Sequence, residues 1–151
     1  LGVVHELNLD ECFYAWENGG AYMNGDKISV SPEKRLGEGL IATGFPYHDY
    51  DRMVPYMEVF DYCMRNTHGL RRLGSAAADL AYVACGRFEA FYEYGLNAWD
   101  VAGGIVLVKE AGGTISDFSG GTNFLFGKEI LTSNSGVHEE FLGVIREKFK
   151  N

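Results

Sequence analysis

Asp100 is the residue whose type and setting point most directly to chemistry. It stands in the run E-Y-G-L-N-A-W-D-V-A-G-G, at the point where a loop is expected to become a helix. Its carboxylate could face a cleft beyond the strand ends and act as an oxygen ligand for Mg²⁺, which prefers carboxylates, waters and substrate phosphate. An Asp at a helix start also caps free backbone N–H groups. The sequence leaves both roles open, because one carboxylate does not make a metal site.

Glu93 is the second acidic candidate. It closes an aromatic-rich strand seven residues before Asp100, so the two carboxylates are expected near the same rim. A carboxylate there suits the hydroxyl groups of a sugar, although a solvated Glu at a strand end is the simpler interpretation. Trp99, Phe91 and Tyr92 are more typical of a core or a pocket wall than of a stacking platform.

Gly74, Ser75 and Ala76 are three small residues that open an expected helix, at a junction without a predicted strand. Small side chains let an anion approach the backbone closely, and a helix N-terminus offers both free N–H donors and a favourable dipole. The alternative is that Ser75 is an ordinary cap and that the alanines pack tightly. Either interpretation fits the residues.

The histidines and cysteines form no recognisable site. The histidines lack the spacing of a zinc site, and the cysteines contain no CxxC pair, so reduced and mostly buried thiols are expected. The absence of GxSxG, GxxxxGK[ST] and strand-following GxGxxG runs argues against serine hydrolases, Walker NTPases and typical dinucleotide enzymes. The residues concerned are His5, His48, His68 and His138, and Cys12, Cys63 and Cys85.

The composition is that of a globular protein. The 151 residues are 46% hydrophobic and 23% charged, which suits one compact domain with a short piece of a second. A formal charge of -8 argues against nonspecific nucleic-acid binding, so a phosphorylated substrate would need local cations or backbone N–H groups. No apolar run has membrane-spanning length, and a cytoplasmic location is expected. Because Leu1 opens directly onto a strand pattern, the chain is expected to start within a domain.

The spacing of apolar residues predicts two kinds of architecture. Short strands separated by Gly and Asn turns over residues 1–31 predict an antiparallel ribbon that belongs to a larger sheet. From Glu38 onward, alternating strands and helices predict an α/β unit. Strands are expected at 39–43, 88–94, 114–118 and 130–132, and helices at 51–66, 75–85, 100–111 and from about 135.

Several runs resemble a known family. W-D-V-A-G-G at 99–104 and E-A-G-G at 110–113 resemble the C-terminal signature of the inositol monophosphatase family. G-S-A-A at 74–77, A-T-G-F-P-Y at 42–47, as in bacterial members, and G-A-Y-M-N-G at 20–25 follow the same order. The resemblance implies an α/β fold class. It comprises the C-terminal layered half of the sugar-phosphatase (αβαβα) fold in residues 37–151, preceded in residues 1–36 by the last antiparallel strands of the N-terminal half.

The resemblance also implies roles for the candidate residues. By similarity, Asp100 is a metal ligand that contacts a substrate hydroxyl, Glu93 contacts the sugar or inositol ring, and Gly74, Ser75 and Ala76 line the substrate pocket. Mg²⁺ ions would activate a water and neutralise the leaving oxygen. The family's Glu-Glu segment and D-P-x-D-G-T motif, which supply most metal ligands, are not among these 151 residues. The isolated chain is therefore expected to hydrolyse little or nothing.

The function expected of the parent protein is Mg²⁺-dependent hydrolysis of a small-molecule phosphomonoester, either inositol monophosphate or a related sugar phosphate. Lithium sensitivity and a homodimer are expected from the same resemblance, with no direct nucleic-acid or membrane partner. A fructose-bisphosphatase-like or nucleotide phosphatase is one alternative. Another is an accessory protein-binding factor of the transcription machinery, as for some bacterial relatives, and a non-catalytic scaffold is the third.

Overall fold

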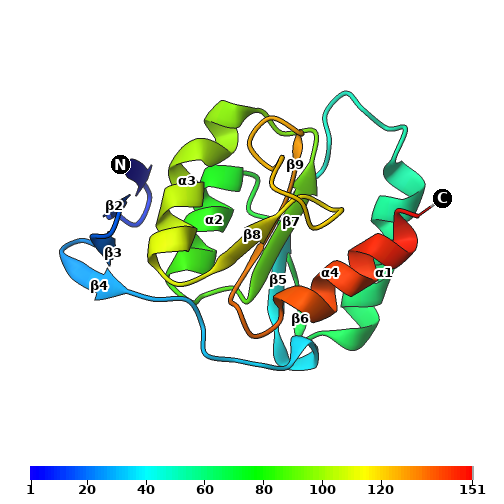
Figure 1. The fold of residues 1–151 in the computed structure, drawn as a ribbon, viewed down its shortest axis with the longest axis horizontal. Helices are drawn as coiled ribbons and strands as arrows, with labels where there is room; N and C mark the ends of the chain where they lie inside the picture. Colours follow the sequence, from blue (N-terminus) through cyan, green and yellow to red (C-terminus); the bar gives the residue numbers. More distant parts are fainter. Residues whose placement is uncertain (151) are drawn as a thin grey trace.

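The computed structural model describes residues 1–150, which form two β-sheets and four α-helices (Figure 1). The first sheet contains β1 (Gly2–Glu6), β2 (Glu11–Trp16), β3 (Gly20–Met23) and β4 (Asp26–Ile28) in sequential antiparallel order. A two-residue turn joins β3 to β4, and its residues Asn24 and Gly25 have φ values of 50° and 98°. Asn-Gly is the pair that best tolerates two consecutive positive φ values, so the sequence itself specifies this hairpin.

The second sheet has the order β6-β5-β7-β9-β8. The strand β5 is parallel to its neighbours β6 and β7, whereas β9 is antiparallel to β7 and β8. The edge strand β6 was not expected from the sequence, and it lies just before Gly74, where no strand was predicted. The strands are β5 (Leu40–Thr43), β6 (Gly69–Arg71), β7 (Ala90–Tyr94), β8 (Thr114–Ser116) and β9 (Glu129–Ser133), and a 3₁₀ turn, Leu36–Glu38, precedes β5.

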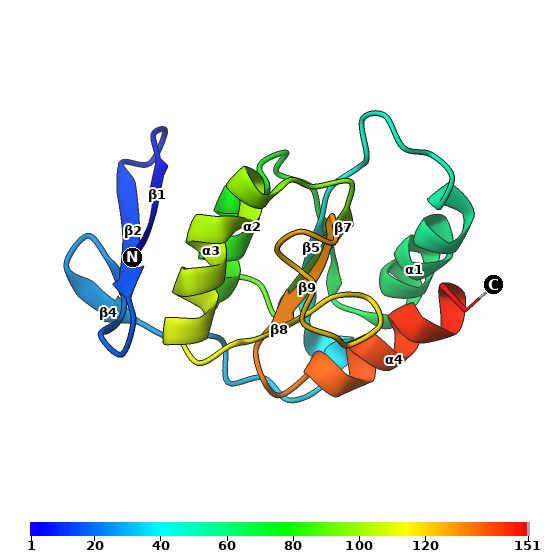
Figure 2. The same cartoon turned by 45° about the horizontal axis from the view of Figure 1, so that its top comes forward.

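The elements stack in layers (Figure 2). Two helices, α2 (Ala76–Ala84) and α3 (Ala98–Glu110), lie between the two sheets, and α1 (Met53–Asn66) and α4 (His138–Lys148) cover the opposite face of the second sheet. Alternation along the strands explains both cores, because successive side chains point to opposite faces. Phe91 packs in the core shared with α2 and α3, whereas Tyr92 packs in the core shared with α1 and α4.

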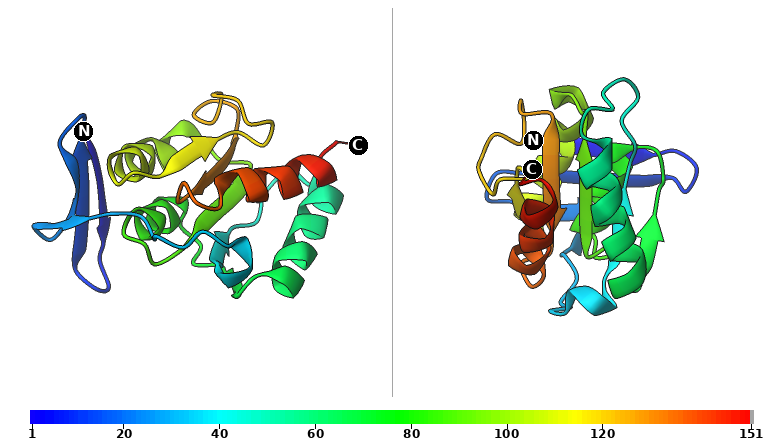
Figure 3. Two further views of the ribbon diagram at one scale, coloured as in Figure 1. Left: turned by 60° about the horizontal axis from the view of Figure 1, so that its bottom comes forward. Right: turned by 90° about the vertical axis from the view of Figure 1, so that its right-hand side faces the viewer.

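The first sheet lies at one end of the molecule, as the left view of Figure 3 shows. Its inward residues Phe13, Ala15 and Ala21 are fully buried in the same core as α2 and α3. Glycines allow the close packing of these layers: a Cβ built on Gly104 of α3 would lie 2.5 Å from the Leu80 Cβ of α2. The proposed division into residues 1–36 and 37–151 stays a prediction.

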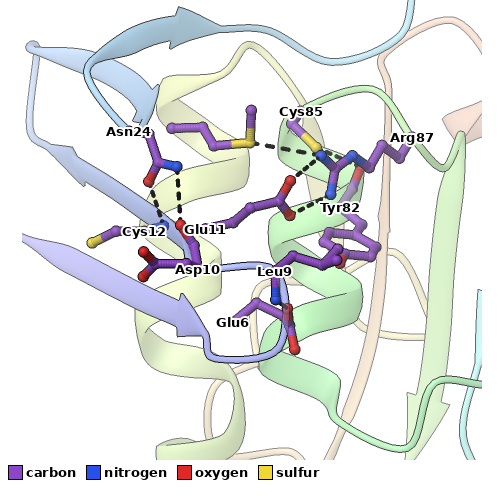
Figure 4. A network of polar contacts seen from close by, with 10 residues as sticks. Glu6, Leu9, Asp10, Glu11, Cys12, Asn24, Tyr82, Cys85 and Arg87 are labelled. Carbon is purple, nitrogen blue, oxygen red and sulfur yellow. Dashed lines mark hydrogen bonds and ion pairs between the residues drawn. The ribbon is translucent and has the colours of Figure 1, made fainter.

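A network of polar contacts also ties the first sheet to α2 (Figure 4). Arg87, just beyond α2, donates from both terminal nitrogens to the Glu11 carboxylate of β2, each at 2.6 Å. The same guanidinium lies over the Tyr82 ring, 4.6 Å from its centroid. On α3, the Glu110 carboxylate accepts from the backbone N–H groups of Asn18 and Gly20, each at 2.9 Å. Polar contacts therefore join the first sheet both to α3 and to the residue that follows α2.

The four helices occur in the predicted order, and several of them begin at a different residue from the one predicted. The first begins at Met53 rather than 51, and Pro55 lies in its first turn, where a missing N–H has no cost. The fourth begins at His138, three residues later than expected. The third begins at Ala98, two residues before Asp100, because Asn97 is its N-cap. Within residues 1–150, no helix is long and apolar enough to cross a membrane.

Candidate functional site

A pocket of about 650 Å³ opens beyond the carboxyl ends of β5 and β7. Adjacent parallel strands end at the same edge of a sheet, and ligands of α/β proteins commonly bind there. Three connections form the walls: the loop that follows β5, the segment that enters α2, and the loop from β7 into α3. The lining residues are Gly44 to Asp49, Arg72, Gly74 to Ala77, Glu93, Gly95 to Asn97, Trp99, Asp100 and Lys128. All five residues proposed from the sequence therefore lie in this one pocket.

Asp100 is the third residue of α3 rather than its N-cap, which corrects the expected helix start. Its Oδ2 accepts a hydrogen bond of 2.9 Å from the backbone N–H of Asn97, the reciprocal contact of a capping box. Among the described residues, Oδ1 of the same carboxylate makes no hydrogen bond. One oxygen thus stabilises the helix start while the other is free for a ligand in the pocket. The two roles left open by the sequence are compatible.

Glu93 is buried rather than solvated, with only 7% of its surface exposed, although it lies at the pocket. The backbone of Gly44 makes room for it: a Cβ built on Gly44 would meet Glu93 Oε2 at 2.1 Å. Its carboxylate makes no hydrogen bond within residues 1–150. Burial, followed by the charges of Asp79 and Asp100, raises the Glu93 pKa to about 8, and Arg72 opposes that shift. The carboxyl group is therefore unpaired and available to a ligand hydroxyl.

Asp79 is a residue that the sequence reasoning missed. It lies in α2 with 1% of its surface exposed, and neither carboxylate oxygen has a hydrogen-bond partner in the described chain. Burial raises its pKa to about 7, against the opposing charge of Arg72. An unpaired buried carboxyl group lowers the stability of the fold, and groups of this kind with shifted pKa values cluster at functional sites. The sequence feature that could have indicated this residue is an acidic side chain among the small apolar residues of an expected buried helix.

The segment that enters α2 also serves two purposes. Ser75 is the N-cap, and its Oγ accepts from the Ala78 N–H at 3.4 Å. The first N–H groups of an α-helix have no partner within the helix, so those of Ala76 and Ala77 remain to meet a ligand in the pocket that these residues line. Gly74 has a φ of 92°, which favours glycine at this turn. Capping and anion binding are again compatible.

Two cationic side chains that were not predicted from the sequence also line the pocket. Arg72 lies at the entrance to α2, with its guanidinium 5.7 Å from the Phe45 ring centroid, and Lys128 comes from the loop before β9. They place two positive charges at this pocket, in a chain whose formal net charge is -8. Trp99, expected in a core or wall, is 80% exposed at the pocket rim. His48 also lines the pocket, through a tertiary proximity that its sequence position did not reveal.

A metal site is only partly represented in these residues. Over residues 1–150, no group of three or more His, Cys, Asp or Glu side chains is placed to hold a metal ion. The free Oδ1 of Asp100 is nevertheless the donor type that Mg²⁺ prefers. The donor set therefore fits one ligand of a magnesium site, and residues 1–150 do not form a complete site by themselves.

Two sheets with helices between and outside them, and a pocket of carboxyl and cationic side chains at the strand ends, agree with the sugar-phosphatase class of α/β fold. A family model described as "Inositol monophosphatase family" matches residues 1–150, and this chain belongs to that family.

Individual relatives agree with this assignment. The chain is 43% identical to "Nus factor SuhB" of Pseudomonas aeruginosa over 94% of its length, and 41% identical to "Fructose-1,6-bisphosphatase/inositol-1-monophosphatase" of Thermotoga maritima over 97%. It spans 55% of the length of each of these relatives. The crystal structure of the extragenic suppressor protein suhB from Bartonella henselae superposes with a TM-score of 0.90 at 36% identity, covering 96% of this chain and 55% of that one.

Proposed function

We propose that this chain forms the substrate-binding part of a Mg²⁺-dependent phosphatase that hydrolyses inositol monophosphate or a related sugar phosphate. One observation carries the proposal: Asp100, Glu93 and the Gly74–Ala76 helix start converge on a single pocket that also contains Arg72 and Lys128. Carboxylates for hydroxyl groups and cations for a phosphate are the complement of a phosphorylated polyol. Membership of a phosphatase family supports this interpretation.

Each residue has a distinct task in this proposal. The Glu93 carboxyl group exchanges hydrogen bonds with a ring hydroxyl, because it has no protein partner among the described residues and opens only onto the pocket. Asp100 offers Oδ1 to a Mg²⁺ ion and to a neighbouring hydroxyl. The free N–H groups at the start of α2 and the small side chains of Ser75 and Ala76 bind and orient the substrate.

The metal would supply charge neutralisation at the phosphate and an activated water. This chain's residues position the substrate for that chemistry and provide one metal ligand. The chain alone is therefore expected to hydrolyse little or nothing, whereas a longer form with the remaining ligands is expected to be active and lithium-sensitive. The name of the Thermotoga relative makes fructose 1,6-bisphosphate a substrate to compare with inositol monophosphate.

The test is phosphate release by a full-length form of the protein with Mg²⁺. Asp100→Asn keeps an acceptor for the Asn97 N–H but removes the charge, so at least a hundredfold loss of kcat with little change in melting temperature is expected. Asp26→Asn, at an exposed position in β4, is the matched control and should be neutral. Wild-type turnover in Asp100→Asn would refute the metal role.

A second function rests on a different observation. The Pseudomonas relative is named a Nus factor, and this chain carries a formal charge of -8, which suits a basic protein partner. We propose an accessory protein contact with the transcription machinery as the alternative to metabolic phosphatase activity. Capture of purified RNA polymerase or Nus proteins by the full-length protein, unaffected by Asp100→Asn, would support it. A failure to retain any of them at physiological salt would exclude it.

A homodimer and a cytoplasmic location also remain proposals. The helix α1 exposes Val54, Met57 and Met64, to the extent of 73%, 43% and 57% of their surfaces. Exposed apolar side chains of this kind are typical of a protein interface, so this face could contribute to a dimer. Sedimentation of the full-length protein, with Met57→Glu as the variant, tests the assignment: the variant should become monomeric.

A further inference from the structure

Two buried hydroxyl groups lie directly behind the wall of the pocket. Thr43 ends β5 and Tyr56 belongs to α1, and both side chains are fully buried. Their oxygens are 2.6 Å apart. The Tyr56 hydroxyl lies 2.8 Å from the Gly44 carbonyl oxygen, and the Thr43 hydroxyl lies 3.0 Å from the Tyr92 carbonyl oxygen. Together they join the ends of the two parallel strands that form the floor of the site.

The two carbonyl groups belong to the backbone that places Glu93. The Tyr92 carbonyl is part of the peptide that carries the Glu93 N–H. The Glu93 carboxyl group lies directly against Gly44, because a Cβ built on Gly44 would come within 2.3 Å of all three carboxyl atoms. The hydroxyl pair therefore fixes both the strand that bears Glu93 and the surface that receives its side chain.

The position of the Glu93 side chain depends on packing rather than on hydrogen bonds, because only 7% of its surface is exposed. No hydrogen bond from residues 1–150 reaches its carboxylate, and an unrestrained Glu loses much of the benefit of its position through side-chain entropy. We infer that Tyr56 and Thr43 are positioning residues that hold Glu93 in its substrate-facing orientation through Gly44 and Tyr92. This inference rests on the proposed function, since it assumes that Glu93 contacts the substrate.

Tyr92 provides a matched control within the same cluster. Its ring lies 5.1 Å from that of Tyr56, and it is also fully buried. Its hydroxyl, however, has no hydrogen-bond partner in the part of the chain described. Tyr56→Phe removes a hydroxyl that is hydrogen-bonded to Gly44, whereas Tyr92→Phe removes one with no hydrogen-bond partner in residues 1–150. An effect that comes only from removing a buried hydroxyl group from this aromatic cluster would appear in both variants.

The experiment measures KM and kcat of the full-length enzyme with inositol monophosphate and Mg²⁺. Tyr56→Phe should raise KM by about two- to tenfold, the equivalent of one net hydrogen bond, with a smaller change in kcat. Tyr92→Phe should leave KM unchanged. Thr43→Val should behave like Tyr56→Phe, and Thr43→Ser, which restores the hydroxyl, should return KM to the wild-type value.

A double-mutant cycle connects the effect to Glu93. In a Glu93→Gln background, Tyr56→Phe should raise KM less than it does in the wild type, because the side chain that it positions has already been changed. Equal effects in both backgrounds, or an unchanged KM in Tyr56→Phe and Thr43→Val, would overturn the inference. If either variant fails to fold, the Thr43→Ser and Thr43→Val pair or the remaining variant decides the question.

A structural measurement separates this inference from the proposed function. Crystal structures of full-length Tyr56→Phe and Tyr92→Phe should show the Glu93 carboxyl group displaced from Gly44 in the first and unmoved in the second. An unmoved Glu93 in Tyr56→Phe would refute the positioning role whatever the enzyme's activity. If wild-type enzyme releases no phosphate from any phosphorylated polyol, the proposed function fails, and the crystal structures still test the positioning.

Discussion

The Glu93 carboxyl group lies so close to the Gly44 backbone that any side chain at position 44 would overlap it, with a built Cβ only 2.1 Å from Oε2. This contact joins the two parallel strands at the pocket and leaves the carboxyl group facing the ligand space. Glycine directly after β5 is therefore a requirement of this arrangement, and the contact can be tested directly.

Gly44→Ala is expected to displace Glu93 and to reduce the stability of the protein. Forcing a methyl group into a packed site typically costs about 1–3 kcal/mol. Urea denaturation and substrate KM should both change. Gly143→Ala is the control, because nothing lies within 4 Å of a Cβ at that position of α4. There, alanine should be neutral or stabilise the helix by about 0.5–1 kcal/mol.

Asp79→Asn should increase stability at alkaline pH. Burial raises the Asp79 pKa to about 7 from an ordinary value of 3.8. The native state therefore keeps a proton that the unfolded chain has lost, so this group lowers stability progressively as pH rises from about 4 to about 7, and the loss persists above that range. The variant should have a flatter stability profile and gain roughly 1–3 kcal/mol at pH 8. Denaturant unfolding at pH 5 and pH 8 checks this, and equal profiles for both proteins would contradict it.

His138 should make the protein sensitive to acid. The residue is 3% exposed, with Nδ1 2.7 Å from the Ser133 hydroxyl and Nε2 3.1 Å from the Ser116 hydroxyl. Burial lowers the His138 pKa from its ordinary value of 6.5, with the nearby Glu139 charge opposing that shift. The unfolded chain then takes up a proton first, so stability falls as pH drops below about 6.5. Thermal unfolding between pH 7 and pH 5 should show a smaller loss in His138→Gln than in the wild type, whereas His68→Gln should follow the wild type.

Removal of the Arg87 guanidinium should loosen the first sheet from α2. Arg87 donates two hydrogen bonds of 2.6 Å to Glu11, and the Glu11 side chain is only 14% exposed. Charge-assisted hydrogen bonds of this kind contribute about 1.5–3 kcal/mol. Arg87→Met should therefore lower the free energy of unfolding by about that amount, and Arg87→Lys, which cannot form the paired contact, should recover only part of it.

Hydrogen exchange locates the effect of the Arg87 variants. Faster exchange in β1 to β4 with unchanged exchange in β7 and β9 would agree with local loosening. Uniform acceleration throughout the chain would show instead that the contact stabilises the whole fold. An exposed pair, Arg65 and Asp61 in α1, is the control, and Arg65→Met should cost at most about 0.5 kcal/mol.

The sequence by itself determined the features that depend on local chemistry. The Asn24–Gly25 turn, the Ser75 cap and the α/β order of elements follow from backbone preferences and from the spacing of apolar residues. The family also followed from the sequence, because its signature is a continuous run. The prediction that Glu93 and Asp100 lie near the same rim rests on a simple rule, since Glu93 closes a strand and Asp100 follows it. The place of Gly74, Ser75 and Ala76 in the same pocket was implied by the family resemblance.

Only the tertiary structure decided which groups are buried and which are paired. Glu93 is shielded from solvent because Gly44, the residue after β5, lies against it, and Asp79 is an unpaired carboxyl group in the interior. Arg72, Lys128 and His48 reached the pocket from loops with no motif of their own. The short strand β6 exists because its backbone pairs with β5. Burial and pairing arise from contacts between distant segments, and no local pattern encodes them.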